Sequence, residues 1–558
     1  MAVIDSKVIF VTTSPRTPSK MIPEIALLKE HFEGKQWNHD SQVAFMELLR
    51  DENYFNGSGA KDPAFSARDR INRAPKSLGF VSLSPTIALT PAGERLITAK
   101  RTEEIFLRQL LKFQLPSPFH ISGQNAADFR IKPYLELFRL VRHFGALKFD
   151  ELMIFSLQMT DYHQFDSIVA KIEKFRVDKV KNTNNYNAFK KEYLYNELKV
   201  LYSKEITDGN TKTRESGDNS VGAFLSTKAR NMRDYADACI RYLRATGMVN
   251  ISHVGKTLSI AEEKIEEVDY FLNTIDREPF YVEDKKEYSE YLGNPNIPAL
   301  WSDNRDRILS RLKNEFPNIT IDEKTPAGKL KDILDNSLYI RQQDILYKEV
   351  ASIKNKQEYD DIQNTFEQID KANLYDGPLM LEWNVWRAMT MLDGGNISAN
   401  LKFDDFGKPM STAQGNMADI ECDYDSFAVT VEVTTASGQR QYEMEGEPVA
   451  RHLGKFKKST GKETYCLFIA PTINPACISH FFVLQQMNVE FYGGKSTIIP
   501  LELRVFRKMI EDVYKASYTP SPSQVEKLFK FSQSIAKNAK SEMDWYNKVK
   551  EKALHWLE

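Results

Sequence analysis

Cysteine is scarce in this sequence of 558 residues. The four cysteines, Cys239, Cys422, Cys466 and Cys477, are scattered, and no two of them have C-x-x-C spacing. This distribution argues against a zinc knuckle and against a disulfide framework. Because so few unpaired thiols are typical of a reducing compartment, we expect a cytoplasmic protein.

Long hydrophobic runs are also absent. No stretch of about 18 apolar residues appears, which argues against a membrane-spanning helix. The start of the chain, Met1 to Asp5, has no basic region followed by an apolar one, so we expect no secretory signal. The net charge of −2 gives no global nucleic-acid signature. Local clusters of Lys and Arg matter more for DNA binding than the sum of charges.

The length predicts about three domains. We interpret residues 1–128 as a first DNA-recognition module. A short basic helix is predicted near residues 66–73, and short strands at residues 78–81 and 87–89. Thr90 suits a helix N-cap, followed by proline at the first helical position. A basic helix followed by two strands is the layout of a winged helix-turn-helix.

Residues 129–264 predict a second module with the same layout. Apolar positions between Lys228 and Arg244 follow the i, i+3, i+4, i+7 spacing of an amphipathic helix. Residues 249–252 and 257–260 then predict a β-hairpin. The polar stretch inside this module predicts a solvated loop from Asp208 to Asn219. The two modules share a layout but no residue-level repeat.

A helical linker is predicted for residues 265–372, which are highly charged. We assign residues 373–558 to an α/β nuclease core that ends in a helical tail. Two predicted helices of this core carry candidate catalytic groups. The helix at residues 379–392, expected to end at Gly394-Gly395, carries Glu382. A second helix covers residues 442–458 and carries Glu445 and His452, which lie seven residues apart and face one way if the helix is continuous.

Two acids lie on predicted strands between these helices. Asp419 belongs to a short strand at residues 417–422, and Glu432 to a strand at residues 427–433 with alternating apolar and mixed positions. A tight turn between the two strands would place the carboxylates side by side. Further apolar strands are predicted at residues 465–470 and 497–501.

Paired carboxylates suit magnesium-dependent cleavage of a phosphodiester. The cation neutralises charge that develops at phosphorus and lowers the pKa of the attacking water. Magnesium prefers one or two carboxylates together with waters and substrate phosphate. We therefore predict a metal site formed by Asp419, Glu432 and the backbone carbonyl of Val433. Glu382, Glu445 and His452 are candidates to orient the water or to assist proton transfer.

Each of these features has a simpler interpretation when taken alone. Two acids at this spacing are more often a solvated surface pair than a metal site. Likewise, the basic residues Arg451, Lys455, Lys457 and Lys458 are more often an exposed helix face than a set of phosphate contacts. The combination of strand pairing, helix order and a nearby helical glutamate is what favours a nuclease.

Several motifs point to a known family. The most specific are Glu432–Thr435, Met444–His452 and Leu467–Pro471, and weaker ones are Ser14–Pro18, Phe32–Gly34, Ala64–Arg70, Arg230–Asp234, Tyr291–Pro295 and Leu381–Trp383. With these motifs the chain resembles the AlwI-type family of type IIS restriction endonucleases over most of its length. Within that family the likeness is closest to BstNBI-like nicking enzymes that read GAGTC.

The resemblance implies a PD-(D/E)XK-type nuclease domain that uses Mg²⁺. The implied active-site group is Glu382, Asp419, Glu432, Val433, Glu445 and His452. The resemblance further implies a prokaryotic enzyme whose N-terminal modules bind a short asymmetric DNA site, while the nuclease domain cuts a few base pairs to one side. A second copy or a small catalytic subunit would be needed to cut both strands.

Two positions depart from the family pattern. Ala418 replaces the usual proline before the first acid, which matters little because that proline is not a ligand. Thr434 replaces the lysine two residues after the second acid, so the water must be activated without an ammonium group. Glu445 and His452 are the candidates to compensate.

Sequence discrimination requires Arg, Lys, Asn or Gln at base edges, whereas phosphate contacts only position the protein. The candidate DNA-binding residues are Arg16, Lys20, Arg68, Arg70, Arg73, Lys76, Lys228, Arg230, Asn231 and Arg233. Two alternatives to a restriction nuclease stay open at this point. One is a non-catalytic DNA-binding regulator, and the other is a repair nuclease that acts on damaged duplex.

Overall fold

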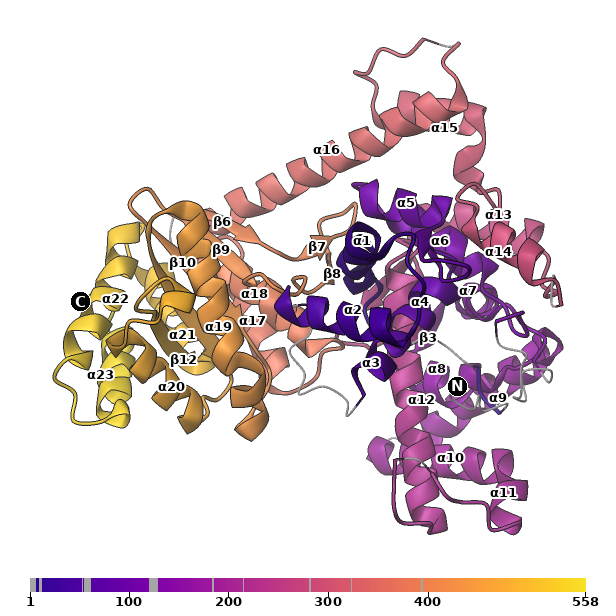
Figure 1. Ribbon diagram of the computed structural model, residues 1–558, viewed down its shortest axis with the longest axis horizontal. Coiled ribbons are helices and arrows are strands. Elements are labelled where there is room, and N and C mark those ends of the chain that lie inside the picture. The colour runs from indigo at the N-terminus through magenta and orange to yellow at the C-terminus, as the bar shows by residue number, and fades with distance from the viewer. Residues whose placement is uncertain are drawn as a thin grey trace. The chain divides into compact units, whose positions relative to one another are not determined.

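The computed structural model describes residues 7–9, 13–52, 54, 62–119, 129–182, 185–213, 215–280, 283–322, 324–392 and 395–558. The architecture is mixed α/β with more helix than strand (Figure 1). The chain divides into two compact units. An N-terminal unit comprises Met1–Glu47 and Gly59–Ser337, and a C-terminal unit comprises Leu48–Ser58 and Leu338–Glu558. The finer division into four parts stays a prediction.

A short two-stranded ladder lies between helices early in the chain. β1 and β2 pair antiparallel with Val81 opposite Leu89. The first strand begins later than the sequence pattern predicts, because Gly79 and Phe80 donate their N–H groups back to the α4 segment and form a turn. Thr90 caps α5 as predicted and accepts the Gly93 N–H at 3.1 Å. The elements are α1 (Met21–Phe32), α2 (His39–Asp51), α3 (Pro63–Asn72), α4 (Ala74–Ser77), β1 (Val81–Ser82), β2 (Ala88–Leu89), α5 (Pro91–Thr98) and α6 (Glu103–Lys112).

The predicted hairpin of the second segment is present and belongs to a three-stranded sheet of order β3-β5-β4. Ser220 caps α12 through its side chain, so this helix begins before the predicted Lys228. The polar stretch before it contains α10 and α11, which the sequence analysis missed, and the described residues of the predicted loop follow them. The elements are α7 (Pro133–Phe144), β3 (Ala146–Lys148), α8 (Phe149–Ile154), α9 (Phe165–Lys181), α10 (Tyr186–Leu201), α11 (Ser203–Thr207), α12 (Val221–Arg244), β4 (Val249–Ser252) and β5 (Thr257–Ile260).

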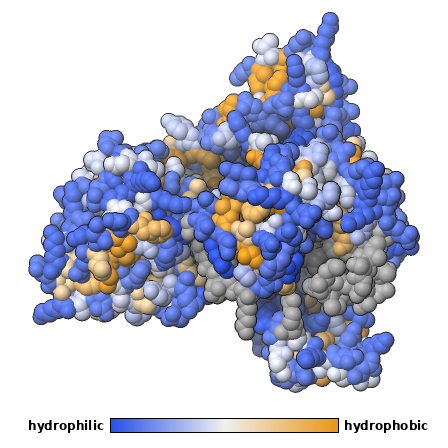
Figure 2. Space-filling view, viewed as in Figure 1, coloured by the Kyte–Doolittle hydropathy of each residue, from blue (hydrophilic) through white to orange (hydrophobic). Residues whose placement is uncertain are grey.

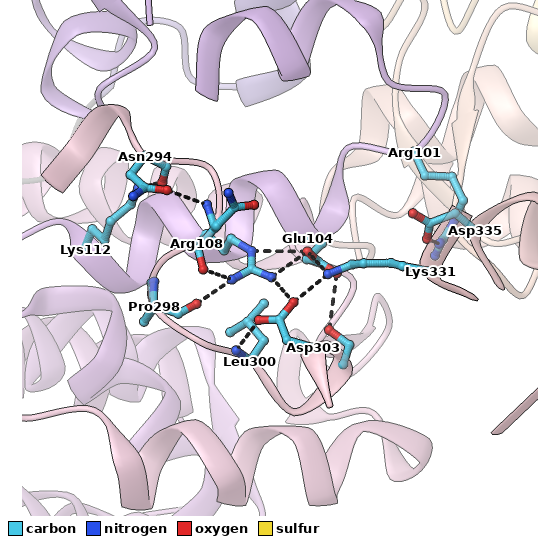
Figure 3. Close-up of polar contacts among 12 residues, drawn as sticks. Arg101, Glu104, Arg108, Lys112, Asn294, Pro298, Leu300, Asp303, Lys331 and Asp335 are labelled. Carbon is cyan, nitrogen blue, oxygen red and sulfur yellow. Dashed lines mark hydrogen bonds and ion pairs between the residues drawn. The ribbon is translucent and has the colours of Figure 1, made fainter. Parts of the chain in front are cut away.

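The region predicted as a linker is helical, and buried polar contacts join its first part to α6 (Figure 3). Arg108 bonds Glu104 at 2.9 Å and also binds Asp303, and Lys331 lies 2.7 Å from both acids. Lys112 is fully buried and donates to the carbonyls of Leu292 and Asn294, each at 2.7 Å. The elements are α13 (Ile265–Thr274), α14 (Lys285–Gly293), α15 (Arg305–Glu315), α16 (Ala327–Lys354) and α17 (Tyr359–Asp370).

The C-terminal unit contains a five-stranded sheet of order β12-β11-β10-β9-β6. β10, β11 and β12 are parallel, whereas β9 is antiparallel to β10 and to β6. Helices α18 to α23 pack around this sheet and share its apolar core. The elements are α18 (Gly377–Leu392), β6 (Asn396–Ala399), β7 (Lys402–Phe403), β8 (Pro409–Ser411), β9 (Ile420–Asp423), β10 (Phe427–Val433), α19 (Gly438–Thr460), β11 (Glu463–Ala470), α20 (Pro475–Gln486), β12 (Thr497–Glu502), α21 (Leu503–Lys515), α22 (Pro522–Ala536) and α23 (Glu542–Leu554).

β10 is more deeply buried than its alternating sequence suggests. The positions of its mixed face, including Thr430 and Glu432, are buried, as are Val429 and Val431. The reason is that β10 is an interior strand of the sheet and α19 packs against it. A carboxylate on this strand is therefore held in a largely desolvated environment.

The surface visible in Figure 2 is predominantly hydrophilic, with scattered apolar patches. In the part of the chain that the structure describes, no helix is both long enough and apolar enough to cross a membrane.

Candidate active site

The two acids singled out on strands lie at one end of the β9–β10 ladder. The antiparallel register places Ile420 opposite Val431, so Asp419, directly before β9, comes next to Glu432. The Asp419 side chain contacts the residue after Glu432, because the Val433 N–H donates to Asp419 Oδ2 at 2.8 Å. The predicted short strand begins one residue after Asp419 rather than before it.

Helix α19 brings a histidine to the same place. His452 Nδ1 lies 2.8 Å from Glu432 Oε1. The buried Gln441 near the start of α19 fixes the path of the helix, because its Nε2 donates to the carbonyls of Ala436 and Thr472 at 2.9 and 2.8 Å. The helix is continuous through Pro448, which is the condition for Glu445 and His452 to lie on the same face.

Burial shapes the electrostatics of this group. It raises the pKa of Glu432 well above its usual value, and the negative charge of Glu445 adds to the effect. Burial lowers the pKa of His452 to about 4, helped by the nearby cations Arg451 and Lys455. His452 is therefore neutral at pH 7. Its Nε2 atom is buried and has no hydrogen-bond partner among the described residues.

Thr434 occupies the position where the family pattern has a lysine. Its Oγ1 accepts the Ala436 N–H at 3.0 Å. Burial raises the pKa of Glu445, and the nearby Thr434 side chain opposes the rise. The threonine thus connects the strand that carries Glu432 to the helix that carries His452.

Glu382 lies on α18 and is almost fully buried. Its Oε1 atom accepts the backbone N–H of Ala413 at 2.7 Å. Ala413 belongs to the segment that leads from β8 to Asp419. This hydrogen bond therefore holds Glu382 against the segment that leads to Asp419.

Three polar residues near the acids were not predicted from sequence: Glu421, Asn400 and Asn416. Glu421 pairs with Thr430 and shares the face of Asp419, and its i, i+2 spacing from that acid was the signal that could have found it. Asn400 donates from Nδ2 to the Ala418 carbonyl at 2.7 Å. Both asparagines come from segments whose sequence has no periodic signal.

The donor set around the acids fits a hard divalent cation. Asp419 and Glu432 lie opposite each other at one end of the ladder, and each contributes a carboxylate. Among the described residues no group of three or more His, Cys, Asp and Glu side chains is close enough to hold a metal by itself. A site with two protein carboxylates leaves the remaining positions to waters and substrate, which is how magnesium is commonly bound.

The candidate DNA-binding residues fall into two classes. Several cations already have partners: Arg70 pairs with the buried Glu24, Arg73 with Asp69 at 2.6 Å, and Arg16 with Asp234 at 3.1 Å. The others in this class are Arg68, bonded to Gln42, and Lys76 and Lys228, which lie over the rings of Phe119 and Tyr202. The second class consists of residues on the surface. Lys20, Arg230 and Arg233 are exposed, and Asn231, between the two arginines on α12, is half-buried. Arg230 and Arg233 make no ion pair with any described residue.

A comparison with protein-family models matches residues 76–509 to the AlwI restriction endonuclease model. The matched residues make up more than half of the chain. The chain belongs to the AlwI restriction endonuclease family. This membership makes it a DNA endonuclease with a restriction function, and DNA is its substrate.

Two solved structures were found to be similar to this AlwI-family chain. The small subunit of the heterodimeric restriction endonuclease R.BspD6I is 26% identical, over 36% of this chain and 95% of that one, with a TM-score of 0.28. The restriction endonuclease FokI is 10% identical over 95% and 99% of the two chains, with a TM-score of 0.22. These scores are too low to support an argument about the fold. A search of curated proteins returned no match.

Proposed function

We propose that the protein is a type IIS endonuclease that uses Mg²⁺ to cleave a phosphodiester a few base pairs outside a short, asymmetric, GAGTC-like site. The observation that carries the proposal is the pairing of Asp419 with Glu432 at the end of the β9–β10 ladder. Family membership supports endonuclease activity, and the paired carboxylates support the choice of metal.

The C-terminal unit would be a PD-(D/E)XK-type nuclease domain. Asp419, Glu432 and the carbonyl of Val433 would hold the cation. Bound there, Mg²⁺ would neutralise charge at the phosphate and lower the pKa of an attacking water. The Val433 N–H fixes the Asp419 carboxylate, and His452 fixes that of Glu432.

Glu445 and His452 would take over proton handling from the absent lysine. The Nε2 of the neutral His452 has no hydrogen-bond partner among the described residues, so it could bond the attacking water, but its pKa of about 4 makes it the weaker proton acceptor of the two. Glu445 has a raised pKa and lies near Thr434. A group whose pKa lies nearer to the working pH is a better general acid or base.

The N-terminal unit would read DNA through its helix-and-hairpin segments, in the manner of winged helices. α12 offers the best surface, because Arg230 and Arg233 are exposed and free to bond bases or phosphates. Arg70 on α3 and Arg73 directly after it, by contrast, would have to leave their acid partners to bind DNA.

One catalytic group per chain predicts cleavage of one strand per bound molecule. Cutting both strands would require a second copy or a small catalytic subunit. Strand-specific nicking is therefore the default for the isolated protein.

The test is to incubate supercoiled plasmid that carries candidate sites with the purified protein and Mg²⁺, and to sequence the ends by run-off. The expected product is an open circle with one nick at a fixed offset from one asymmetric sequence. Linear product would indicate a double-strand cutter. Unchanged plasmid under all divalent metals, with intact binding, would leave a DNA-binding regulator or a nuclease that acts only on damaged duplex.

A further inference from the structure

The segment between β8 and β9 presents Asp419, and it contains an unusual backbone position. Asn416 has a φ of +73°, in the left-handed region that residues other than glycine rarely adopt. Asparagine tolerates this conformation better than most residues. The segment is therefore bent sharply three residues before the first acid of the candidate active site.

Two cations on α19 hold this bend. Arg451 Nη1 donates to Asn416 Oδ1 at 3.0 Å, and Lys455 Nζ donates to the same oxygen. Arg451 is only 3% exposed, and Glu447 holds it from one turn earlier at 3.0 Å. A neutral amide oxygen thus lies between two positive charges. Burial lowers the pKa of Lys455, and repulsion from Arg451 adds to the effect.

The same segment is also held from its other side. Asn400, directly after β6, donates from Nδ2 to the Ala418 carbonyl, and its N–H donates to the Asp419 carbonyl at 3.0 Å. The backbone of Asp419 is therefore fixed between the sheet edge and α19. Helix α19 also carries His452, the partner of Glu432.

We propose that Asn416 is a positioning residue, which transmits the location of α19 to Asp419 and so sets the spacing of the two metal-binding carboxylates. The inference rests on the proposed function of Asp419 and Glu432. Metal affinity depends on such supporting contacts, and their loss commonly costs about 10- to 100-fold in affinity or activity.

Two variants separate the hydrogen bonds from the backbone bend. Asn416→Gly keeps the left-handed conformation and removes the acceptor, whereas Asn416→Asp keeps both and pairs with the two cations. Ala372→Gly is a matched control, because Ala372 also has a positive φ of 52° in the same unit but lies after α17, outside the site.

The measurements are Tb³⁺ binding by luminescence and the Mg²⁺ concentration for half-maximal single-turnover nicking, with melting curves to check the fold. In Asn416→Gly both metal affinities should fall about tenfold, while DNA binding without metal is unchanged. Asn416→Asp should restore both to near the parent values, and Ala372→Gly should leave them unchanged.

Two results would overturn the positioning role. One is parent-like metal dependence in a folded Asn416→Gly protein that still nicks. The other is a loss that Asn416→Asp does not restore, because the acceptor would then not be what matters. If Arg451 and Lys455 served only to bind phosphate, Asn416→Gly would bind DNA more tightly, with metal affinity unchanged. Failure of the parent protein to nick would instead contradict the proposed function itself.

Discussion

Buried charges behave differently in the two units of the molecule. In the N-terminal unit the buried Arg108 meets Glu104 and Asp303, and Lys331 completes the group (Figure 3). In the C-terminal unit the buried Glu432 and the half-buried Glu445 have raised pKa values, and the Nε2 of His452 has no hydrogen-bond partner among the described residues.

This difference in pairing distinguishes charges that stabilise the fold from charges that serve a function. A network in which each charge has a partner holds segments together and gains nothing from a ligand. A group of like charges in a desolvated place is costly unless something binds there, and perturbed pKa values of this kind cluster at functional sites. The comparison therefore points to the C-terminal unit as the place of chemistry.

The largest expected effect on stability is at the paired network. Arg108→Met leaves Glu104 and Asp303 buried with less positive charge, which should cost about 3–5 kcal/mol of unfolding free energy. Arg142→Met removes an exposed pair with Asp269 (2.7 Å) and should cost less than about 1 kcal/mol. Urea unfolding of both variants measures the difference. Equal costs would contradict the structural role of the network.

Replacing Glu432 by an uncharged side chain should stabilise the protein, whereas replacing Arg108 destabilises it. Burial raises the folded-state pKa of Glu432, so the metal-free protein loses stability as pH rises through that pKa. Glu432→Gln should therefore raise the Tm of the metal-free protein at pH 8, and the gain should disappear below about pH 4, where the unfolded carboxyl is protonated as well.

Melting curves across this pH range, without metal, provide the measurement. The exposed Glu463 at the start of β11 is a matched control, and Glu463→Gln should show no such pH-dependent gain. A Glu432→Gln protein that melts lower than the parent at pH 8 would mean that the ionised carboxylate is stabilising, against this account.

The smallest expected effect concerns DNA contacts of the N-terminal unit. Arg230→Ala removes an exposed cation that makes no ion pair with any described residue. If Arg230 reads a base, DNA binding should weaken by about 1–3 kcal/mol at the specific site; if it binds phosphate, binding should weaken to a similar extent on all sequences. Arg73→Ala removes a cation already paired with Asp69 and should matter less. Fluorescence anisotropy without Mg²⁺ ranks the two variants, and the reverse order would move the recognition surface to α3.

The placement of Asp419 opposite Glu432 could be predicted from the sequence, because two adjacent strands joined by a tight turn determine it. The Thr90 cap, the hairpin at residues 249–260 and the continuous α19 were also predictable from local patterns. The sequence did not predict α10 and α11, because tertiary packing can make a polar stretch helical without a clear periodic signal.

Long-range contacts account for much of what the sequence did not predict. Arg70 stays a predicted DNA-binding residue, but its partner Glu24 is visible only in the fold, whereas Arg73 pairs with Asp69 four residues earlier, a spacing that the sequence does contain. Asn400 contacts the Asp419 segment from the end of β6, and Asn416, within that segment, is held by Arg451 of α19. An isolated asparagine gives no sequence signal for either contact. The proximity of Thr434 to Glu445 likewise depends on how α19 packs against β10.

The central claim is that Asp419 and Glu432 hold a catalytic cation, and a pair of aspartate variants tests it most directly. Asp419→Ala should lower single-turnover nicking by about a thousandfold, since several kcal/mol of transition-state stabilisation are lost, while DNA binding is kept. Asp425→Ala, at the exposed turn between the same strands, should cut like the parent. Nicking at the parent rate by a folded Asp419→Ala protein would contradict the claim.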